Sequence, residues 1–410
     1  MPSPGVERRG PDGAVATRRT SLGAVRPDDI RQHNLSLLLS HVHRDGALTR
    51  AELTQRLHLS RSTVGALVGD LAQLGLIEEV VPSGGARVGR PSHVVAPHAA
   101  GPYAVGVDVD VAHVTVAAIT LGGSVAAREV IATDGVVQPD GLVRLILDAL
   151  TRLRTSAASA GRVCGVGISI PGTVDVATGR IGVAPNLGWE NVPLGRMLQD
   201  ELPIQAPVVI GNDADLAVLA EHQRGNARDS DDVVFLIGRI GVGAGIIING
   251  VPVRGRDGHA GEIGHNVLDP SGPLCHCGKH GCMETFLGES ALLKLAGRRG
   301  PRTDQKVAAL FADAHAGDAA ALGAVTEAAE TLGRAIANLL NTLNPERVIL
   351  GGSLGEVLEL ARPQVEAAVT RYTFGDAGPG VVLALPAFGP DSALVGAGEV
   401  AFTALLADPH

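Results

Sequence analysis

The sequence predicts an α/β protein in two unequal parts: a small, mainly helical N-terminal domain and a large domain in which strands and helices alternate. Between residues 30 and 96, apolar residues recur at helical spacing in three short segments, and two strand-like runs follow them. From Tyr103 onward, apolar strands run repeatedly into helices. A glycine-rich segment at residues 258–284 then holds three of the four cysteines of the chain. These three observations fix the order of the parts and the stretch that most resembles a site.

Composition limits the class of protein. The chain has 410 residues, of which 45% are hydrophobic, so it can bury sizeable cores in about two to three domains. It has no apolar run near the ~18 residues of a membrane span. No signal peptide opens the sequence. We therefore expect a cytoplasmic protein without a membrane partner.

Charge is distributed unevenly along the chain. The formal net charge is −9, but residues 1–100 contain 12 Arg, no Lys and 9 acidic residues, a net charge of +3, which leaves −12 for the remainder. The positively charged N-terminal region is therefore suited to bind a polyanion such as DNA, whereas the negatively charged remainder would repel one. Residues 1–26 are rich in Gly, Pro, Ser and Arg without an apolar period, which predicts a disordered tail. Such a tail either touches DNA or only solubilises the chain.

Residues 27–97 are predicted to form a winged helix-turn-helix domain. Thr49 and Glu52 have the spacing of a capping box at the start of the second helix, and Ser60 caps the third. The third helix begins with Arg61, Ser62 and Thr63, which suit the reading of base edges in a major groove. The expected apolar faces of the three helices are Leu35, Leu38, Leu39 and Val42; Ala51, Leu53 and Leu57; and Val64, Leu67, Val68 and Leu71.

Two strands, at about 77–81 and 92–96, are predicted to form a hairpin after the third helix. The loop between them is polar and glycine-rich and carries Arg87 and Arg90. After a helix-turn-helix, such a loop is typical of a wing that lays arginine into a minor groove; the alternative is an ordinary solvated turn. Residues 98–102 are the expected linker to the large domain, and they are too few to let the two domains move independently.

The large domain, residues 103–410, is predicted to place polar residues where strands run into helices. Asn212 and Asp213 follow the apolar strand PVVIG directly, and such turns are where α/β folds carry their sites. The expected strands are AVGVDVD, HVTVAAIT, AREVIAT, VCGVGISI, PVVIG, the glycine-rich pair VVFLIGRIGVGAGIIING, and RVILGG; the expected long helices are 138–159, 318–343 and one that reaches about Tyr372.

The cysteine-rich segment predicts a metal site. Cys275, Cys277 and Cys282 fall within eight residues, and His265 stands ten residues before the first of them. Three thiolates and one imidazole make the closed tetrahedral set expected of structural Zn²⁺. The alternative is a chance cluster of small buried cysteines.

Several motifs together make the chain resemble the ROK family (repressor, open reading frame, kinase) in its transcriptional-regulator branch. They are GEIGH at 261–265, CHCGKHGCME at 275–284, GNDAD at 211–215 and GVGAGIIING at 241–250, preceded by the winged helix. The resemblance implies a two-lobed, actin-like or ribonuclease-H-like ATPase fold with a sugar held between the lobes. It implies zinc at His265, Cys275, Cys277 and Cys282, and sugar contacts from Asn212, Asp213, Glu262, His265 and Glu284, with Asn186 as a further candidate.

The chemistry of the residues agrees with a sugar ligand. A sugar is a ring of hydroxyl groups, and carboxylates such as Asp213, Glu262 and Glu284 can each bind two of them. His265 can bind a metal through one nitrogen and offer the other to a hydroxyl. For Glu262 the alternative is a surface carboxylate, although its position between two glycines and beside a metal ligand favours the site.

The chain departs from the kinases of the family at both phosphate-binding loops. In place of the pattern D-x-G-x-T it has Asp110 for the glycine and Ala112 for the threonine. Arg239 and Ile240 stand before Gly241 where the second loop usually reads G-T-G-x-G. Because backbone amides and hydroxyls at these positions grip phosphate, we expect no catalysis, with Asp213, the kinases' catalytic base, kept as a sugar ligand.

The sequence therefore predicts a repressor whose affinity for double-stranded operator DNA depends on a sugar or sugar phosphate. The alternative is an ATP-dependent sugar kinase with an attached DNA-binding domain. Because operators read by helix-turn-helix proteins are commonly near-palindromic, a homodimer or a dimer of dimers is expected.

Overall fold

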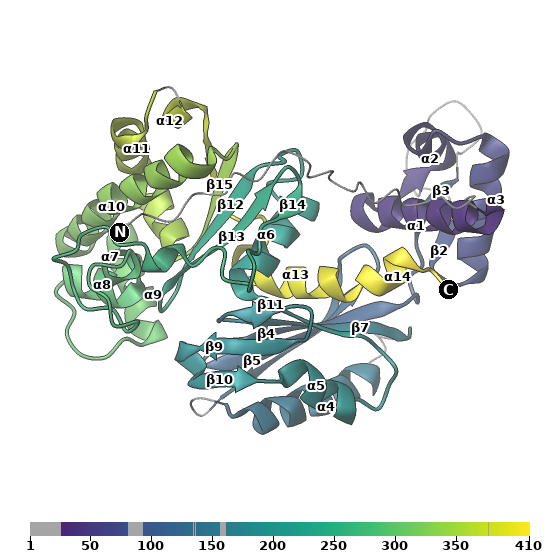
Figure 1. Cartoon of the computed structure of the whole chain (residues 1–410), viewed down its shortest axis with the longest axis horizontal. Helices are drawn as coiled ribbons and strands as arrows, with labels where there is room; N and C mark the ends of the chain where they lie inside the picture. Colours follow the sequence, from purple (N-terminus) through teal and green to yellow (C-terminus); the bar gives the residue numbers. More distant parts are fainter. Residues whose placement is uncertain (1–25, 81–92, 134, 136, 156–160, 376) are drawn as a thin grey trace, which may run out of the picture.

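The computed structural model of the chain describes residues 26–80, 93–133, 135, 137–155, 161–375 and 377–410. A small helical domain, in purple, lies at one end of the molecule and two α/β lobes make up the rest (Figure 1). Of the predicted tail, only Arg26 belongs to the described residues, and the loop that carries Arg87 and Arg90 lies outside them. Within the described part, no helix is long and apolar enough to cross a membrane.

The N-terminal domain has the predicted three helices and hairpin. They are α1 (Pro27–Asp45), α2 (Arg50–Leu57), α3 (Arg61–Gln73), β2 (Ile77–Val80) and β3 (Val94–Pro97). The Thr49 hydroxyl accepts the Glu52 amide and the Glu52 carboxylate accepts the Thr49 amide, which confirms the capping box. Ser60 caps α3 by accepting the Thr63 amide. The predicted apolar residues are buried, except that Ala51 is exposed and Leu57 half-buried. A short strand that was not predicted, β1 (Leu48–Thr49), pairs with β3.

The first lobe is built on a five-stranded sheet in the order β11-β7-β4-β5-β6. Its strands are β4 (Tyr103–Val109), β5 (His113–Thr120), β6 (Val125–Ala132), β7 (Val163–Ile170) and β11 (Val208–Asn212). The first three form an antiparallel meander, and β7 and β11 then add in parallel beside β4. The helix α4 (Pro139–Thr155) covers one face of this sheet (Figure 1).

The second lobe repeats this topology. Its sheet has the order β14-β13-β12-β15-β16, with an antiparallel meander of β12 (Val233–Gly238), β13 (Val242–Ile248) and β14 (Val251–Pro252). The strands β15 (Arg347–Gly352) and β16 (Val382–Ala384) add in parallel beside β12. The long helices α10 (Ala319–Leu343) and α11 (Ser353–Tyr372) pack together over this sheet. Two lobes with one topology confirm the predicted actin-like, ribonuclease-H-like fold.

Shorter elements complete both lobes. They are β8 (Val174–Asp175), β9 (Arg180–Ala184), β10 (Trp189–Val192), α5 (Leu194–Glu201), α7 (Glu284–Leu287), α8 (Glu289–Leu295), α9 (Asp304–His315), α12 (Ala377–Gly380), α14 (Thr403–Ala407) and the 3₁₀ turns η2 (Pro185–Leu187), η3 (Ile263–His265) and η4 (Gly389–Asp391). The strands β8, β9 and β10 form a small antiparallel sheet of their own.

Two helices cross between the lobes. The helix α6 (Asp213–Gln223) follows β11 of the first lobe but packs on β12 and β13 of the second, and α13 (Ser392–Ala401) follows the second sheet but packs on β4 and β7 of the first. Glycine permits this closeness, because a Cβ atom at Gly167 would lie 1.8 Å from the Ala397 carbonyl oxygen and one at Gly396 would lie 1.9 Å from that of Leu216. No pattern in the sequence predicted α13.

The N-terminal domain docks on the end of α13. The Glu399 carboxylate, with 1% of its side chain exposed, accepts a hydrogen bond from Arg224 and lies 2.9 Å from His43 Nε2 of α1. The Gly122 amide donates to His43 Nδ1 at 3.1 Å, and His43 Nε2 lies 2.9 Å from Glu399 Oε2 and 2.7 Å from Arg224 Nη2. Burial raises the pKa of Glu399, but His43 and Arg224 outweigh it and the pKa falls below its ordinary value. The charge is therefore kept inside the junction.

Apolar and polar contacts surround this ion cluster. The His43 ring lies 4.8 Å from that of Phe402, which belongs to the same buried cluster as the core of the N-terminal domain. Arg228 pairs with Asp45, and Gln32 bonds Asp408 at 2.6 Å. The predicted linker, residues 98–102, connects β3 to β4. Within it, the Ala99 amide donates a hydrogen bond to the Glu78 carboxylate. The two domains are therefore joined by packing as well as by the linker.

We predict that Glu399→Ala lowers the free energy of unfolding by about 3–5 kcal/mol, because it leaves Arg224 buried without its carboxylate. Urea unfolding followed by circular dichroism measures the change. The matched control is Glu366→Ala, because Glu366 makes an exposed pair with Arg362 on α11 and its loss should cost less than about 1 kcal/mol. Equal losses for the two variants would show that the buried cluster adds nothing beyond a surface pair.

Candidate functional site: a polar cleft beside a cysteine cluster

A cavity of about 1000 Å³ opens between the two lobes. Segments of both lobes line it, among them the turn after β4, the turn after β7, η2, the start of α6, the turn between β12 and β13, the GEIGH segment, the cysteine-rich segment and α8. All six residues predicted to contact a sugar line this cavity, namely Asn186, Asn212, Asp213, Glu262, His265 and Glu284. The fold thus gathers polar groups that are up to 98 positions apart in the sequence.

The start of α6 brings Asn212 and Asp213 to the cavity. Asn212 is the N-cap residue. Its side-chain oxygen accepts hydrogen bonds from the backbone amides of Ala214 and Asp215, and its side-chain nitrogen donates one to the Gly172 carbonyl at 3.0 Å. Its oxygen is therefore committed to holding the helix, a role that the sequence analysis did not assign. Asp213 is only 9% exposed and presents its carboxylate from the first turn. Its Oδ1 accepts the Ala214 amide at 2.9 Å, which leaves Oδ2 as the oxygen of this pair of residues that faces the cavity without a helix-capping role.

The GEIGH segment lies directly on β13. A Cβ atom at Gly261 or Gly264 would come within 2.1 Å of the carbonyl oxygen of Ala244 or Val242, so only glycine allows this approach. The segment then forms η3, with Glu262 before it and His265 at its end. The Glu262 side chain is 42% exposed, and its carboxylate lies 4.0 Å from His265 Nε2. Both side chains therefore belong to the cavity wall, with Glu262 the more accessible.

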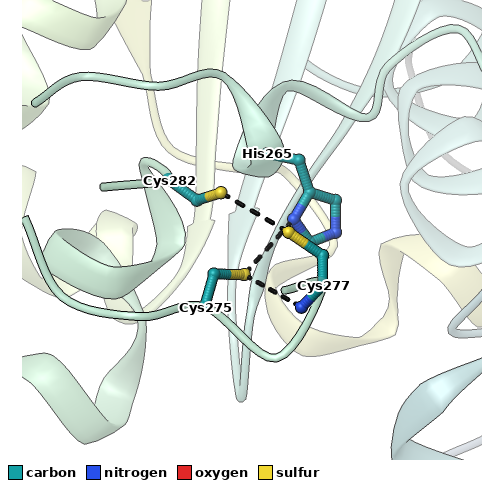
Figure 2. A group of neighbouring side chains, drawn as sticks. All are labelled: His265, Cys275, Cys277 and Cys282. Carbon is teal, nitrogen blue, oxygen red and sulfur yellow. Dashed lines mark hydrogen bonds between the residues drawn. The ribbon is translucent and has the colours of Figure 1, made fainter. Parts of the chain in front are cut away.

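The cysteine-rich segment brings four potential ligand atoms together. His265 Nδ1 lies 3.6 Å from Cys275 Sγ, and Cys277 Sγ lies 3.6 Å from Cys282 Sγ. Figure 2 shows the three sulfur atoms and the imidazole converging on one point, and all four atoms lie within 4.8 Å of one another. Tetrahedral coordination with bonds of about 2.1–2.3 Å requires ligand separations of about 3.5–3.8 Å, so the arrangement fits a four-coordinate ion.

Glycine shapes the turn of the cysteine-rich segment. Gly278 and Gly281 have φ values of 84° and 71°, in the left-handed region. A Cβ atom at Gly281 would lie 1.5 Å from the Asp269 carbonyl oxygen. The Cys275 amide donates to the Lys279 carbonyl at 2.8 Å, which closes the loop between the first two thiols and the third.

Glu284 joins the cysteine cluster to the cleft. Its Oε1 atom accepts a hydrogen bond from Cys275 Sγ at 2.8 Å and lies 2.9 Å from His276 Nδ1. His265, His276 and Glu284 form a second group whose ligand atoms lie close together. Three thiols and one imidazole remain the better set for a soft, closed site, because the second group offers only three donors. One Glu284 oxygen is thus turned toward the cluster, and a ligand in the cleft would meet the other.

Burial changes the acidity of the α6 carboxyl groups. It raises the pKa of Asp213 to about 6; Asp108 and Asp110 add to the rise, and Arg239 opposes it. Burial also raises the pKa of Asp215 to about 7. The negative charges of Asp213 and Glu262 raise this pKa further, and the positive charge of Arg254 lowers it. Asp215 also lines the cavity, although the sequence analysis did not single it out. The available signal was its place in the motif GNDAD, two residues after Asp213.

The other predicted site is on the N-terminal domain. Arg61, Ser62 and Thr63 are all exposed at the start of α3. The Ser60 hydroxyl lies 2.8 Å from those of both Ser62 and Thr63, which orders this first turn. The structure therefore leaves the predicted recognition residues open to a partner.

A winged helix followed by two lobes of this topology, with a polar cleft between them, defines the class of sugar-kinase-like proteins with an attached helix-turn-helix domain. Residues 104–403 match the ROK family, and residues 36–87 match the MarR family of winged-helix proteins. The chain belongs to the ROK family.

Its relatives include both repressors and kinases. The xylose repressor of Bacillus subtilis is 31% identical over 348 residues, which cover 83% of this chain and 88% of the relative. The glucokinase of Halalkalibacterium halodurans is 32% identical over 312 residues, covering 72% of this chain and 93% of the relative. The crystal structure of a ROK family transcriptional regulator, a homologue of the E. coli MLC protein, matches with a TM-score of 0.75 and 26% identity over 92% of this chain and 97% of its own.

We predict that Asp215→Asn stabilises the protein increasingly as pH rises. Because the folded pKa of Asp215 is raised from its ordinary value to about 7, the native state loses stability as pH rises through that value, and asparagine removes this loss. The variant should gain about 2–3 kcal/mol over the wild type between pH 5 and pH 8.

Melting temperatures and urea midpoints across this pH range provide the measurement. Asp200→Asn is the control, because that carboxylate is 68% exposed on α5. A gain for Asp215→Asn that did not vary with pH would contradict the assignment of a buried, titrating carboxyl group.

Proposed function

We propose that the protein is a transcriptional repressor whose affinity for operator DNA depends on a sugar bound in the cleft between the lobes. One observation carries this proposal: the helix α6 begins at the cleft with Asp213, and the residue that ends it, Arg224, contacts the docked winged helix. The match of 83% of the chain to a xylose repressor and of 92% to the structure of a ROK family transcriptional regulator supports it. The match of residues 36–87 to the MarR family supports the DNA-binding part.

The proposed sugar site uses Asp213, Glu262, His265 and Glu284. Carboxylates accept hydrogen bonds from hydroxyl groups, and His265 Nε2 points away from the thiols toward Glu262. Asn186 lines the same cavity from η2, and Asn212 positions α6. The site therefore offers several acceptors for a ligand that is rich in hydroxyl groups.

The proposed DNA contacts follow from the winged-helix geometry. Arg61, Ser62 and Thr63 would meet base edges, and Arg87 and Arg90 of the wing would add phosphate and groove contacts. Two such domains related by a two-fold axis would read a near-palindromic operator, so we propose a homodimer or a dimer of dimers.

We propose that coupling runs through α6 and α13. A ligand that changes the closure of the lobes shifts α6 against α13, because these helices pack on opposite lobes. Their backbones are in direct contact at Gly396 of α13 and Leu216 of α6. Both helices end at the His43, Arg224 and Glu399 junction. A change there alters the position of the winged helix, and half-site spacing on B-DNA tolerates little such change.

We propose that His265, Cys275, Cys277 and Cys282 hold a structural Zn²⁺. The ion would fix the imidazole tautomer and the positions of Glu262 and Glu284 on either side of the cluster. It would thus act on the sugar site through geometry alone.

We predict one zinc per chain, and we predict that Cys277→Ser lowers both the zinc content and the melting temperature, because binding energy of a structural ion is folding energy. Elemental analysis of protein purified without chelator measures the first, and thermal unfolding the second. Cys164→Ser is the control, because Cys164 is a buried cysteine outside the cluster. Wild-type protein without zinc would overturn the assignment.

A kinase remains the second candidate, because a glucokinase is among the relatives. We propose that this chain does not transfer phosphate. In the kinase pattern the position of Asp110 is a glycine, whereas here Asp110 receives a hydrogen bond from Arg239. The turn after β4 and the turn after β12, which would bind the phosphates of ATP, are therefore joined by this ion pair.

We predict that Glu262→Ala abolishes the response to the sugar and leaves sugar-free operator binding unchanged within about twofold, because Glu262 belongs to the cleft and lies outside the winged helix. Operator affinity with and without sugar, for example by fluorescence anisotropy, measures both. A ligand that binds one state ~100-fold better would shift operator affinity by up to ~2.7 kcal/mol in the wild type.

Glu327→Ala is the matched control, because Glu327 is an exposed carboxylate on α10. It should respond to the sugar as the wild type does. A full response from Glu262→Ala would place the effector elsewhere.

A further inference from the structure

An ion cluster bridges the two lobes at one end of the cleft. Asp110 follows β4 of the first lobe, and Arg239 follows β12 of the second. Arg239 Nη1 donates to Asp110 Oδ2 at 3.2 Å, and Nη2 lies 3.9 Å from Asp108 Oδ2. The side chain of Arg239 is 26% exposed and that of Asp108 is 8% exposed. The cluster therefore links the two turns that face each other across the cleft.

This cluster has more carboxyl groups than guanidinium groups. Asp108 is fixed by a hydrogen bond of 2.7 Å from the Ser169 hydroxyl. Asp213 stands close enough for the charges of Arg239, Asp108 and Asp110 to act on its carboxyl group. Arg239 is thus already paired with Asp110 and Asp108, and Asp213 stands nearby as a third carboxyl group, so the guanidinium group is not free to pair with an anionic ligand.

The other charged groups of the cavity do not change this balance. Arg302 is committed to Glu289 and Asp304. Lys279, Lys294 and Glu262 are exposed where they line the cavity, and exposed charges of either sign are strongly screened. Glu284, with 10% of its side chain exposed, presents a further carboxylate. An anionic ligand would therefore meet buried carboxylates, while the guanidinium groups of Arg239 and Arg302 are already paired.

We propose that the cleft selects an uncharged sugar and excludes its phosphate ester, and that the carboxylates of Asp108, Asp110 and Asp213 around Arg239 enforce this choice. This inference rests on the proposed function and names its ligand class. Placing like charges together without compensation costs several kcal/mol, which corresponds to a preference for the uncharged sugar of about 100-fold or more.

The test compares matched pairs of ligands on the full-length protein by isothermal titration calorimetry. The uncharged probes are D-glucose, D-mannose, N-acetyl-D-glucosamine and D-xylose, each against its own monophosphate. We expect at least one uncharged sugar to bind about 100-fold more tightly than its phosphate ester. A phosphate ester that binds as tightly as its sugar, or more tightly, overturns this inference and leaves the proposed function intact. If no member of any pair binds, the proposed function fails and this inference fails with it.

Charge variants separate electrostatic exclusion from simple loss of shape. Asp110→Asn should reduce the preference for the uncharged sugar about tenfold, and Arg239→Gln should increase it, because one removes a negative charge and the other the positive charge. Asp148→Asn, on the outer helix α4, is the matched control and should leave the ratio unchanged. If Asp110→Asn does not fold, Asp108→Asn provides the same test. Changes of the same sign in Arg239→Gln and the aspartate variant would contradict the charge argument.

Discussion

The buried carboxylate of Glu399 is the contact on which the arrangement of the three bodies depends. It comes from α13, which the second lobe supplies to the first, and it meets Arg224 at the end of α6 and His43 of the winged helix. A buried charge is tolerated only where its partners stay in place, because the loss of one partner leaves an uncompensated ion. The junction therefore holds the winged helix in one position relative to the helices that cross between the lobes. We propose that a change in lobe closure is transmitted to that position.

A second group of paired charges joins the two lobes at the cleft. Where the two turns of the meanders face each other, Arg239 lies between Asp108 and Asp110 and ties one lobe to the other. The cysteine cluster lies beside His265, and His276 holds one oxygen of Glu284 at 2.9 Å. The floor between them is formed by the start of α6. A ligand in this cleft would contact both lobes and the helix that leads to the winged helix, which is the geometry that the proposed sugar-dependent repressor requires.

Local features of the chain could be predicted from sequence because their partners are near in sequence. The capping box at Thr49, the cap at Ser60 and the ligand set from His265 to Cys282 all depend on neighbours within about twenty residues, and the structure places each as expected. The interactions that couple the parts could not be predicted. His43 and Glu399 are 356 residues apart, and Arg239 and Asp110 are 129 apart. No periodicity or motif relates such pairs. Asn212 has a motif position typical of a ligand contact, but the structure uses its amide to cap α6.

The central claim is that a sugar in the cleft changes the contact between the lobes and the winged helix. The amide of Gly122 reports on that contact directly, because it donates to His43 Nδ1 across the junction. Hydrogen exchange at this amide should be measured with and without a saturating sugar, with saturation shown by a raised melting temperature. We expect the sugar to change the exchange rate of Gly122 by about tenfold or more, equivalent to about 1.4 kcal/mol at the junction. An unchanged rate at saturation would contradict the claim that the cleft and the winged helix are coupled through Glu399.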